Sequence, residues 1–197
     1  MFEHPQNPFE LFEAWYTEAK KSLGDEDGSA MCLATADKKA RPSCRMVLLK
    51  GVDERGFVFY TNQQSRKGEE LEENPYAALC FYWMGARKQV RIEGGIKHTT
   101  KAEADAYFKS RHPVSRRGAW ASAQSRPLDH RKSLISKAEG FKEMYPDDNA
   151  IPRPPYWVGY RLVPEAIEFW QEGDNRLHHR VLYTKTSKGW KSGLLYP

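Results

Sequence analysis

The sequence predicts a mainly β protein in which an antiparallel barrel is flanked by peripheral α-helices. Strand-like segments come in consecutive runs with helices between the runs, whereas a doubly wound parallel sheet would alternate strands and helices one by one. Aromatic residues make up 13% of the chain, so large rings must fill much of the core. The 197 residues suffice for one sizeable core, and we expect a single domain over residues 1–197.

The chain opens with a predicted helix over residues 7–24. Asn7 can cap this helix, and Pro8 suits its first turn. Apolar side chains then recur at helical spacing, beginning with Phe9 and Phe12. After this segment the pattern changes to short apolar runs, which indicates that the sheet begins here.

Nine short segments rich in β-branched and aromatic residues predict the strands. They lie at 30–37, 42–51, 56–61, 76–84, 88–99, 157–163, 166–172, 179–185 and 190–196. Three further helices are predicted where apolar residues recur at helical spacing or a polar capping residue precedes the segment. They lie at 65–74, 100–111 and 127–145. A Pro-rich connector separates the last helix from the final strands.

Charge and cysteine content limit the classes of function. The net charge of +5 suits a phosphorylated ligand, a nucleic acid or an acidic partner. Basic and acidic residues are interspersed and the aromatic residues fall at positions expected to be buried, so no nucleic acid is expected as a partner. Cys32, Cys44 and Cys80 have no metal-binding spacing, which predicts buried free thiols. Neither a signal peptide nor a membrane-spanning stretch is visible, which predicts a cytoplasmic protein with no membrane partner.

One candidate phosphate site lies at the start of the helix predicted over 65–74. Ser65, Arg66 and Lys67 follow a predicted strand there, and helix-start amides together with two cations can hold a phosphate. A solvated basic turn is the alternative interpretation of the same residues.

A second candidate phosphate site is formed by Tyr107, Arg111 and Ser115. Tyr107 and Arg111 are four residues apart and share one helix face, and Ser115 follows just past Pro113. The alternative is that Tyr107 packs against the core and Arg111 is solvated.

Two predicted strands also carry cations. Arg45 and Lys50 are five residues apart, so they face opposite sides of a strand unless a bulge intervenes, and a core strand with basic ends is the simplest interpretation. Arg176, His178 and Arg180 occupy alternate positions, which on an extended strand would share one face and point toward an anionic or electron-rich group.

The sequence contains none of the common motifs for a side-chain catalytic site, a metal site or a nucleotide-phosphate loop. There is no Ser-His-Asp order, no paired-carboxylate site, no metal-ligand spacing and no Gly-rich phosphate loop. We therefore expect no metal site, and we expect a bound cofactor to carry the chemistry while the protein supplies position and charge.

Several ordered motifs together resemble the pyridoxine (pyridoxamine) 5′-phosphate oxidase family, FMN enzymes that produce pyridoxal 5′-phosphate. The resemblance runs from about Pro8 to Pro197. The motifs are RMVLLK from Arg45, FYTN from Phe59, SRKGEELEENP from Ser65, KQVRIEG from Lys88, YFKSR from Tyr107, PRPPYWVGYRL from Pro152, IEFWQ from Ile167 and NRLH from Asn175.

The resemblance implies a split β-barrel homodimer with FMN at the subunit interface. The implied FMN contacts are Arg45, Met46, Val47, Leu48, Leu49, Lys50, Tyr60, Thr61, Arg66, Lys67, Gln89, Gln124, Ser125, Trp170 and Arg180. The implied substrate contacts are Lys50, Tyr107, Arg111 and Ser115 at the phosphate, and Arg176, Leu177 and His178 elsewhere. Arg176 and His178 would lie against the pyridine ring as the catalytic residues. The implied substrates are pyridoxine 5′-phosphate or pyridoxamine 5′-phosphate and O2, and the implied products are pyridoxal 5′-phosphate and H2O2.

The sequence departs from the family at position 179, where an Asp is expected and His179 stands instead. A lost carboxylate could leave a neighbouring Arg unpaired and lower the activity. Many members also carry a basic N-terminal segment, to which no residues are assigned here. Two alternative functions stay open: a related flavin oxidase of the phenazine type, which the phosphate-binding residues disfavour, and a non-catalytic protein that binds FMN or pyridoxal phosphate.

Overall fold

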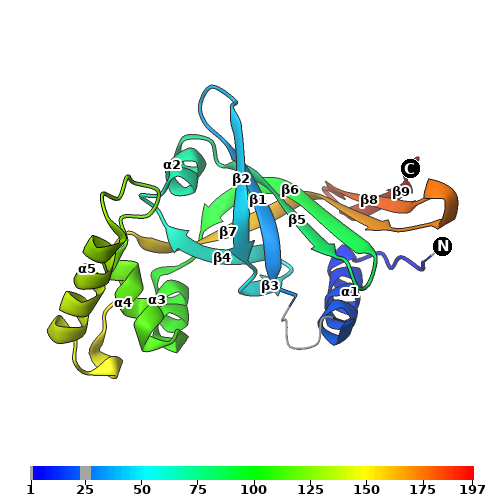
Figure 1. Ribbon diagram of the computed structural model, residues 1–197. Coiled ribbons are helices and arrows are strands. Elements are labelled where there is room, and N and C mark those ends of the chain that lie inside the picture. Colours follow the sequence, from blue (N-terminus) through cyan, green and yellow to red (C-terminus); the bar gives the residue numbers. More distant parts are fainter. Residues whose placement is uncertain (1, 23–27) are drawn as a thin grey trace.

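The computed structural model describes residues 2–22 and 28–197, and within them the chain forms one curled antiparallel sheet with helices at its ends (Figure 1). The helices are α1 (Pro8–Ser22), α2 (Arg66–Glu73), α3 (Lys101–Ser110), α4 (Pro113–Ala121) and α5 (Arg131–Met144). The strands are β1 (Ala30–Ala36), β2 (Pro42–Leu48), β3 (Gly51–Asp53), β4 (Gly56–Asn62), β5 (Tyr76–Trp83), β6 (Lys88–His98), β7 (Trp157–Gln171), β8 (His179–Thr186) and β9 (Gly189–Leu194). The predicted fold class, mainly β with an antiparallel barrel-like sheet and peripheral helices, is confirmed.

The long strand β7 organises the sheet. The strand order is β2-β1-β5-β6-β7-β4-β3, and β8 pairs with both β7 and β9. One edge of β7 pairs with β6, whereas its other edge pairs first with β4 along 157–162 and then with β8 along 166–171. β7 therefore connects two groups of strands, and it runs from the end of the molecule that holds α3, α4 and α5 to the opposite end (Figure 1).

The sheet curls back on itself where the chain passes from β2 to β3. The backbone N–H of Leu49 donates to the carbonyl oxygen of Ser29, beside β1, at 2.8 Å. The next N–H, that of Lys50, donates to the carbonyl oxygen of Val58 in β4, also at 2.8 Å. The chain thus leaves one sheet edge and joins another within two residues, and this crossing closes the barrel.

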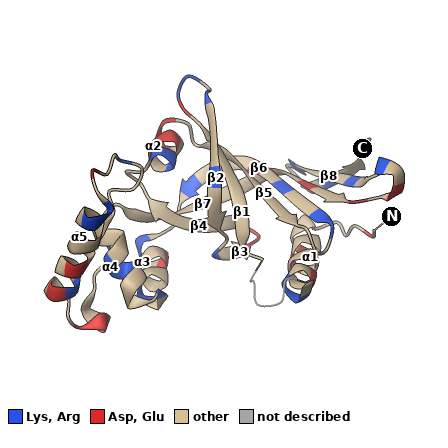
Figure 2. Ribbon diagram, viewed as in Figure 1, with Lys and Arg blue, Asp and Glu red and all other residues tan. Residues whose placement is uncertain are grey.

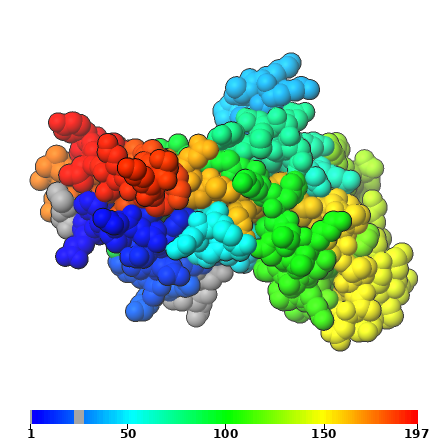
Figure 3. All heavy atoms as spheres, turned by 180° about the vertical axis from the view of Figure 1, so that it is seen from behind, coloured from blue at the N-terminus to red at the C-terminus, as the bar shows by residue number. Residues whose placement is uncertain are grey.

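The core is aromatic, as the composition predicts. Phe12 on α1 packs against Phe57 and Phe81 with ring centroids 4.9 and 5.3 Å apart, and Trp15 packs against Phe169 at 5.2 Å. These five rings are all less than 5% exposed. α1 consequently lies alongside the C-terminal strands, as the space-filling view from behind shows (Figure 3).

The observed elements differ from the predicted ones in four main ways. α4 and the short strand β3 were not expected, and α5 begins at Arg131 rather than at residue 127. The two strands expected at 157–163 and 166–172 form the single strand β7, which continues through Pro164. Proline is tolerated there because it stands opposite Gly94 at the bulge of β6, and on the other edge β4 pairing ends at Leu162 and β8 pairing begins at Ala166. Residues 23 and 24 of the first predicted helix lie outside the described residues.

The cysteines are free, as expected, but they are not buried. Cys44 is exposed, and Cys32 and Cys80 are intermediate in exposure. The reason is strand alternation, because on β1 the side chains of Met31 and Leu33 take the core face and leave Cys32 on the other one.

A bulge in β6 predicts different outcomes for two adjacent glycines. A Cβ at Gly94 would lie 2.1 Å from the carbonyl oxygen of Val163, whereas the nearest atom to one at Gly95 is 3.9 Å away. Gly94→Ala should therefore lower the free energy of unfolding by about 1–3 kcal/mol, and Gly95→Ala should change it far less. Urea unfolding of both variants measures the difference, and equal losses would contradict the close approach seen at the bulge.

Candidate active site

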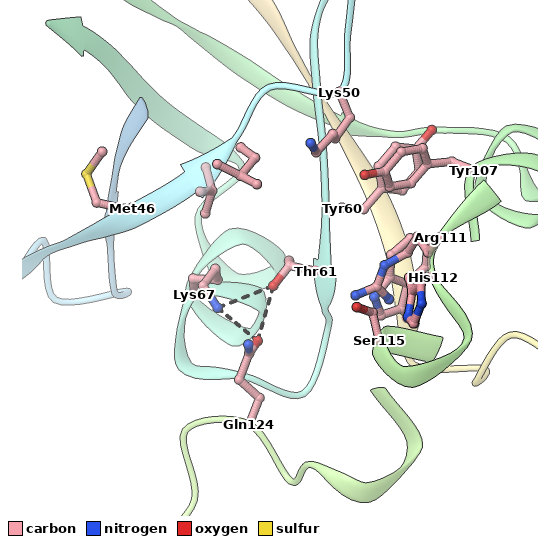
Figure 4. Close-up of a pocket in the computed structure, with 13 residues that line it drawn as sticks. Met46, Lys50, Tyr60, Thr61, Lys67, Tyr107, Arg111, His112, Ser115 and Gln124 are labelled. Carbon is pink, nitrogen blue, oxygen red and sulfur yellow. Dashed lines mark hydrogen bonds between the residues drawn. The ribbon is translucent and has the colours of Figure 1, made fainter. Parts of the chain in front are cut away.

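A cavity of about 470 Å³ lies where the ends of β2, β4 and β7 meet the α3–α4 corner (Figure 4). Its lining combines apolar strand residues, aromatic rings, cations and hydroxyl groups, and no carboxylate belongs to the described residues that line it. The lining residues are Met46, Val47, Leu48, Lys50, Tyr60, Thr61, Lys67, Tyr107, Arg111, His112, Ser115, Gln124 and Trp157. Both phosphate-binding clusters predicted from the sequence thus contribute to one cavity.

Lys67 forms the centre of the first cluster. Its ammonium donates to the hydroxyl oxygens of Thr61 and Ser65 at 3.3 and 3.1 Å and to the amide oxygen of Gln124 at 3.0 Å. The residue is only 8% exposed, and burial, followed by the charge of Arg45, lowers the pKa of Lys67 to about 8. A buried ammonium whose hydrogen-bond partners are neutral oxygens is well prepared to receive an anion.

The turn that presents Lys67 depends on close backbone packing. Ser65 caps α2 by accepting a hydrogen bond from the N–H of Gly68. A Cβ at Gly68 would lie 2.2 Å from the carbonyl oxygen of Gln63, so only glycine allows this approach. The turn between β4 and α2 therefore fixes the start of the helix beside the cavity.

Arg111 forms the centre of the second cluster. Its guanidinium carbon lies 5.0 Å from the ring centroid of Trp157 and 5.7 Å from that of Phe108, so aromatic faces hold it. Its NH1 nitrogen is buried and has no hydrogen-bond partner among the described residues. Burial lowers the pKa of Arg111, against a smaller opposing effect of Tyr107. A desolvated guanidinium with a free donor at the cavity (Figure 4) calls for an anionic ligand.

Three stacked aromatic rings line the cavity on the side of the second cluster. Tyr60 stacks on Tyr107 at 4.3 Å between ring centroids and on Trp157 at 5.1 Å, with interplanar angles of 16° and 5°. These rings come from β4, α3 and β7, so the stack ties the helical corner to the sheet. Lys50 and Tyr107 lie on the same side of the cavity in Figure 4.

Arg45 and Arg66, also predicted to contact a ligand, are engaged elsewhere in the chain. Both pair with Glu70, at 3.2 and 2.8 Å respectively. Burial alone would raise the pKa of Glu70, but hydrogen bonds from Ser43, Thr35 and the two arginines lower it to about 2. Arg45 therefore borders the first cluster without lining the cavity, as does Leu49, which is in the core.

A second group of the predicted residues gathers at the other end of β7. Gln89, Trp170 and Arg180 are cross-strand neighbours on β6, β7 and β8. The rings of Trp170 and His178 are 4.7 Å apart, and Arg180 pairs with Glu168 at 2.7 Å. The concern that His179 leaves a neighbouring arginine unpaired does not apply to Arg180.

The expectation that Arg176, His178 and Arg180 share one strand face is wrong. β8 begins only at His179, and Arg176 closes a 3₁₀ turn in which it has φ 64°. A strand cannot run through a residue in the left-handed region. Arg176 and Leu177 are instead exposed at the turn before β8.

The two groups of residues are far apart within one chain. Trp157 lines the cavity at the start of β7, and Trp170 lies thirteen residues further along the same strand. At about 3.3 Å per residue, this separation is about 43 Å. One small ligand cannot contact both groups of a single chain.

Sequence reasoning missed two residues that line the cavity. Trp157 begins the strand that follows the Pro-rich connector. Its ring packs against the guanidinium of Arg111, a contact that depends on the tertiary structure. His112 stands between Arg111 and Pro113, where it caps α4. Ser125, by contrast, lies outside the cavity lining, in a left-handed conformation with φ 70°.

Two further properties of the described residues bear on the class of site. They contain no group of three or more His, Cys, Asp or Glu side chains placed to hold a metal ion. None of their helices is long and apolar enough to span a membrane. Acidic and basic residues are interspersed on the helices and strands (Figure 2).

Comparison with protein families finds matches along most of the chain. Residues 25–145 match the family described as Pyridoxamine 5′-phosphate oxidase. Residues 157–197 match the family described as Pyridoxine 5′-phosphate oxidase C-terminal dimerisation region. The second match covers β7, β8 and β9, including Trp170, His178 and Arg180 of the distant group, whereas Gln89 falls within the first match.

Individual proteins give the same result. A pyridoxine/pyridoxamine 5′-phosphate oxidase of Gluconobacter oxydans is 54% identical over 191 residues, which cover 97% of this chain and 94% of that protein. One from Myxococcus xanthus is 48% identical and covers 98% and 93%. The crystal structure of PhzG from Burkholderia lata in complex with tetrahydrophenazine-1-carboxylic acid has a TM-score of 0.91 at 33% identity, covering 99% of this chain and 95% of that one. A pyridoxamine 5′-phosphate oxidase-related, FMN binding protein of Nostoc punctiforme shares the fold, with a TM-score of 0.77 at 20% identity and full coverage of both chains.

The buried charge of Lys67 predicts that the site destabilises the ligand-free protein. Because the folded-state pKa of about 8 lies below the ordinary value of 10.5, the folded protein binds fewer protons than the unfolded chain between these values, so stability rises with pH there. Lys67→Met should raise the free energy of unfolding at pH 7 by up to about 3 kcal/mol. This gain should disappear near pH 10.5.

Denaturant unfolding of the ligand-free protein at pH 7 and pH 10 measures this effect. Lys137→Met, at an exposed lysine of α5, is the matched control and should change little at either pH. A Lys67→Met variant that is less stable than the natural protein at pH 7 would contradict the predicted burial cost.

Proposed function

The chain belongs to the pyridoxamine 5′-phosphate oxidase family, and from this premise we propose that it oxidises pyridoxine 5′-phosphate or pyridoxamine 5′-phosphate to pyridoxal 5′-phosphate. We further propose FMN as the cofactor and O2 as the electron acceptor, with H2O2 as the second product. The observation that carries the proposal is a pair of cations, the buried Lys67 and the half-buried Arg111 with its buried NH1 nitrogen, which line one cavity whose described lining residues include no carboxylate. FMN and substrate each bring one phosphate dianion, so two separate cationic clusters match two ligands.

The first cluster suits the FMN phosphate. Lys67 supplies a buried ammonium, and the hydroxyl of Thr61 and the amide of Gln124 lie within hydrogen-bond distance of it. Arg45 and Arg66 border the cluster through Glu70 and add positive potential. When bound, FMN supplies the acceptor for the two electrons of the substrate, and O2 reoxidises it with release of H2O2.

The second cluster suits the substrate phosphate. Arg111 supplies a guanidinium with a free buried donor, Ser115 and Tyr107 supply hydroxyl groups, and Lys50 supplies a second cation. Because aromatic rings and not a carboxylate hold Arg111, a phosphate does not have to displace an internal ion pair. Fixing the phosphate here orients the rest of the substrate within the cavity.

The distant residue group fits the same reaction if a second chain supplies it. We propose a homodimer in which the cavity of one protomer is completed by Arg176 of the partner subunit and His178 of the partner subunit. The match of residues 157–197 to a dimerisation region supports this, as does the separation of about 43 Å along β7 within one chain. Exposed apolar side chains on the sheet, among them Met46 and Tyr82, offer surface for the contact. A guanidinium near the flavin would stabilise the negative charge that develops as it is reduced.

A flavin oxidase of the phenazine type is the second candidate, because the PhzG structure superposes with a TM-score of 0.91. The cavity argues against it. Tetrahydrophenazine-1-carboxylic acid, the ligand named for that structure, has no phosphate, so a substrate of this kind would leave the second cationic cluster, that of Arg111, without a phosphate to bind. Relatives named pyridoxine/pyridoxamine 5′-phosphate oxidase are also more similar in sequence, at 54% identity against 33%.

The direct test is the absorption spectrum and activity of the purified protein. We expect flavin absorption, and we expect pyridoxal 5′-phosphate and H2O2 to form in equal amounts from pyridoxamine 5′-phosphate in air. Bound flavin without turnover would instead favour a non-catalytic binding protein, and turnover of unphosphorylated substrates alone would favour the phenazine-type alternative.

Arg111→Ala should weaken substrate binding without loss of flavin. A charge-assisted hydrogen bond contributes roughly 1.5–3 kcal/mol, so the KM for pyridoxamine 5′-phosphate should rise about tenfold to a hundredfold. Steady-state kinetics and the flavin content of the purified variant measure both quantities. Arg131→Ala, at an exposed arginine on α5, is the control and should match the natural protein. Flavin loss with an unchanged KM would assign Arg111 to the cofactor.

A mixed dimer tests whether the site is shared between protomers. Arg111→Ala and Arg176→Ala homodimers should each be defective, because every site in them lacks one residue. A heterodimer of the two, purified through two different tags, should regain about half of the natural activity, because one of its two sites carries neither substitution. A heterodimer as defective as its parents would show that Arg111 and Arg176 act within one chain, or not together.

A further inference from the structure

His112 occupies the corner between α3 and α4, within the second cationic cluster. Arg111 is the C-cap of α3, His112 is the N-cap of α4, and Pro113 is the first residue of α4. The imidazole lines the cavity beside Arg111 and Ser115 (Figure 4). One tight turn therefore presents a guanidinium, an imidazole and a hydroxyl group to the same part of the cavity.

The hydrogen bond that His112 makes to α4 fixes its tautomer. Its Nδ1 accepts from the backbone N–H of Val114 at 3.3 Å. A ring nitrogen that accepts a hydrogen bond carries no proton, so the proton of the neutral imidazole is on Nε2. Nε2 lies on the opposite side of the ring, so the donor points away from the backbone that the ring caps.

The surroundings of His112 select the kind of partner that this donor can take. The described residues that line the cavity include no carboxylate, and Arg111 and Ser115, which line it beside His112, supply donors. Because the surrounding groups are also donors, an additional N–H donor here is best matched by an anionic ligand, which can accept several hydrogen bonds at once. The capping hydrogen bond holds the ring and the following proline restricts the backbone of His112, so less conformational entropy is lost when the ring binds a ligand.

We propose that His112 donates a hydrogen bond from Nε2 to the substrate phosphate and thereby strengthens the preference for phosphorylated over unphosphorylated substrates. This proposal rests on the proposed function, in which Arg111, Ser115, Tyr107 and Lys50 bind the same phosphate. It adds a hydrogen-bond donor that is positioned by the start of α4 and lies outside the cluster around Lys67.

Two substitutions separate the binding role of His112 from its capping role. Serine is a good N-cap but is too short to reach where Nε2 lies, so His112→Ser keeps the helix and removes the donor. Glutamine places an amide N–H near the position of Nε2, so His112→Gln should restore part of the binding. His130→Asn is the matched control, because His130 is also a helix N-cap but lies outside the cavity lining and makes no capping hydrogen bond.

The measurements are the KM for pyridoxamine 5′-phosphate, the inhibition constant of inorganic phosphate, the kcat/KM for unphosphorylated pyridoxamine, and the flavin content. For His112→Ser we expect the KM for pyridoxamine 5′-phosphate and the inhibition constant of inorganic phosphate to rise about tenfold or more. The kcat/KM for pyridoxamine and the flavin content should stay unchanged. His112→Gln should lie between His112→Ser and the natural protein, and His130→Asn should match the natural protein.

Arg111→Ala, measured in parallel, separates failure of this proposal from failure of the proposed function. If Arg111→Ala weakens phosphate binding and His112→Ser does not, His112 is only a helix cap and the proposal is overturned. An equal loss of kcat/KM for pyridoxamine and for its phosphate would also overturn it, because a general disturbance of the site would then explain the result. If neither variant weakens phosphate binding, the substrate-phosphate assignment itself fails.

Discussion

The two hydrogen bonds that the backbone N–H groups of Leu49 and Lys50 donate to Ser29 and Val58 hold one wall of the cavity in place. They carry the chain from the edge beside β1 to the edge of β4 within two residues. The crossing places Met46, Leu48 and Lys50 along one wall of the cavity. Met46, Leu48 and Lys50 are at alternate positions and share a face, whereas Arg45 is five residues before Lys50 and faces the other side, where it pairs with Glu70.

Charge is distributed around this wall in a way that favours ligand binding over stability. Where a carboxylate is present, as at Glu70, hydrogen bonds and two arginines lower its pKa to about 2 and the cluster is internally neutralised. Lys67 and Arg111 have no such partner in the cavity, and burial lowers the pKa of each. The folded protein thus holds two desolvated cations whose natural counterions are anionic ligands, and binding of such ligands would stabilise the native state.

The sequence predicted the fold class and both cationic clusters because these depend on local patterns. Helix-start residues beside Lys67 and the four-residue spacing of Tyr107 and Arg111 are visible without tertiary information. α4 was missed because its buried positions include two arginines, Arg116 and Arg117. A search for apolar residues at helical spacing treats arginine as an exposed residue and so finds no buried helix face there. The shared face of Arg176, His178 and Arg180 was wrong because alternation alone does not show where a strand begins. His112 was missed because its cap and its place in the cavity depend on how α3 meets α4.

The turn before β8 shows why a single chain does not explain its own C-terminal residues. Asn175 and Arg176 both adopt the left-handed conformation, with φ of 53° and 64°, and for arginine this is an uncommon and unfavourable state. The turn leaves Arg176 exposed and Leu177 69% exposed, so the strain is not offset by burial within the protomer. Contacts with another surface would account for both features. The strand β7 keeps this turn and the cationic cavity apart, because they lie at opposite ends of one rigid element. In a two-fold symmetric pair of chains, the turn of each chain can therefore lie against the cavity of the other.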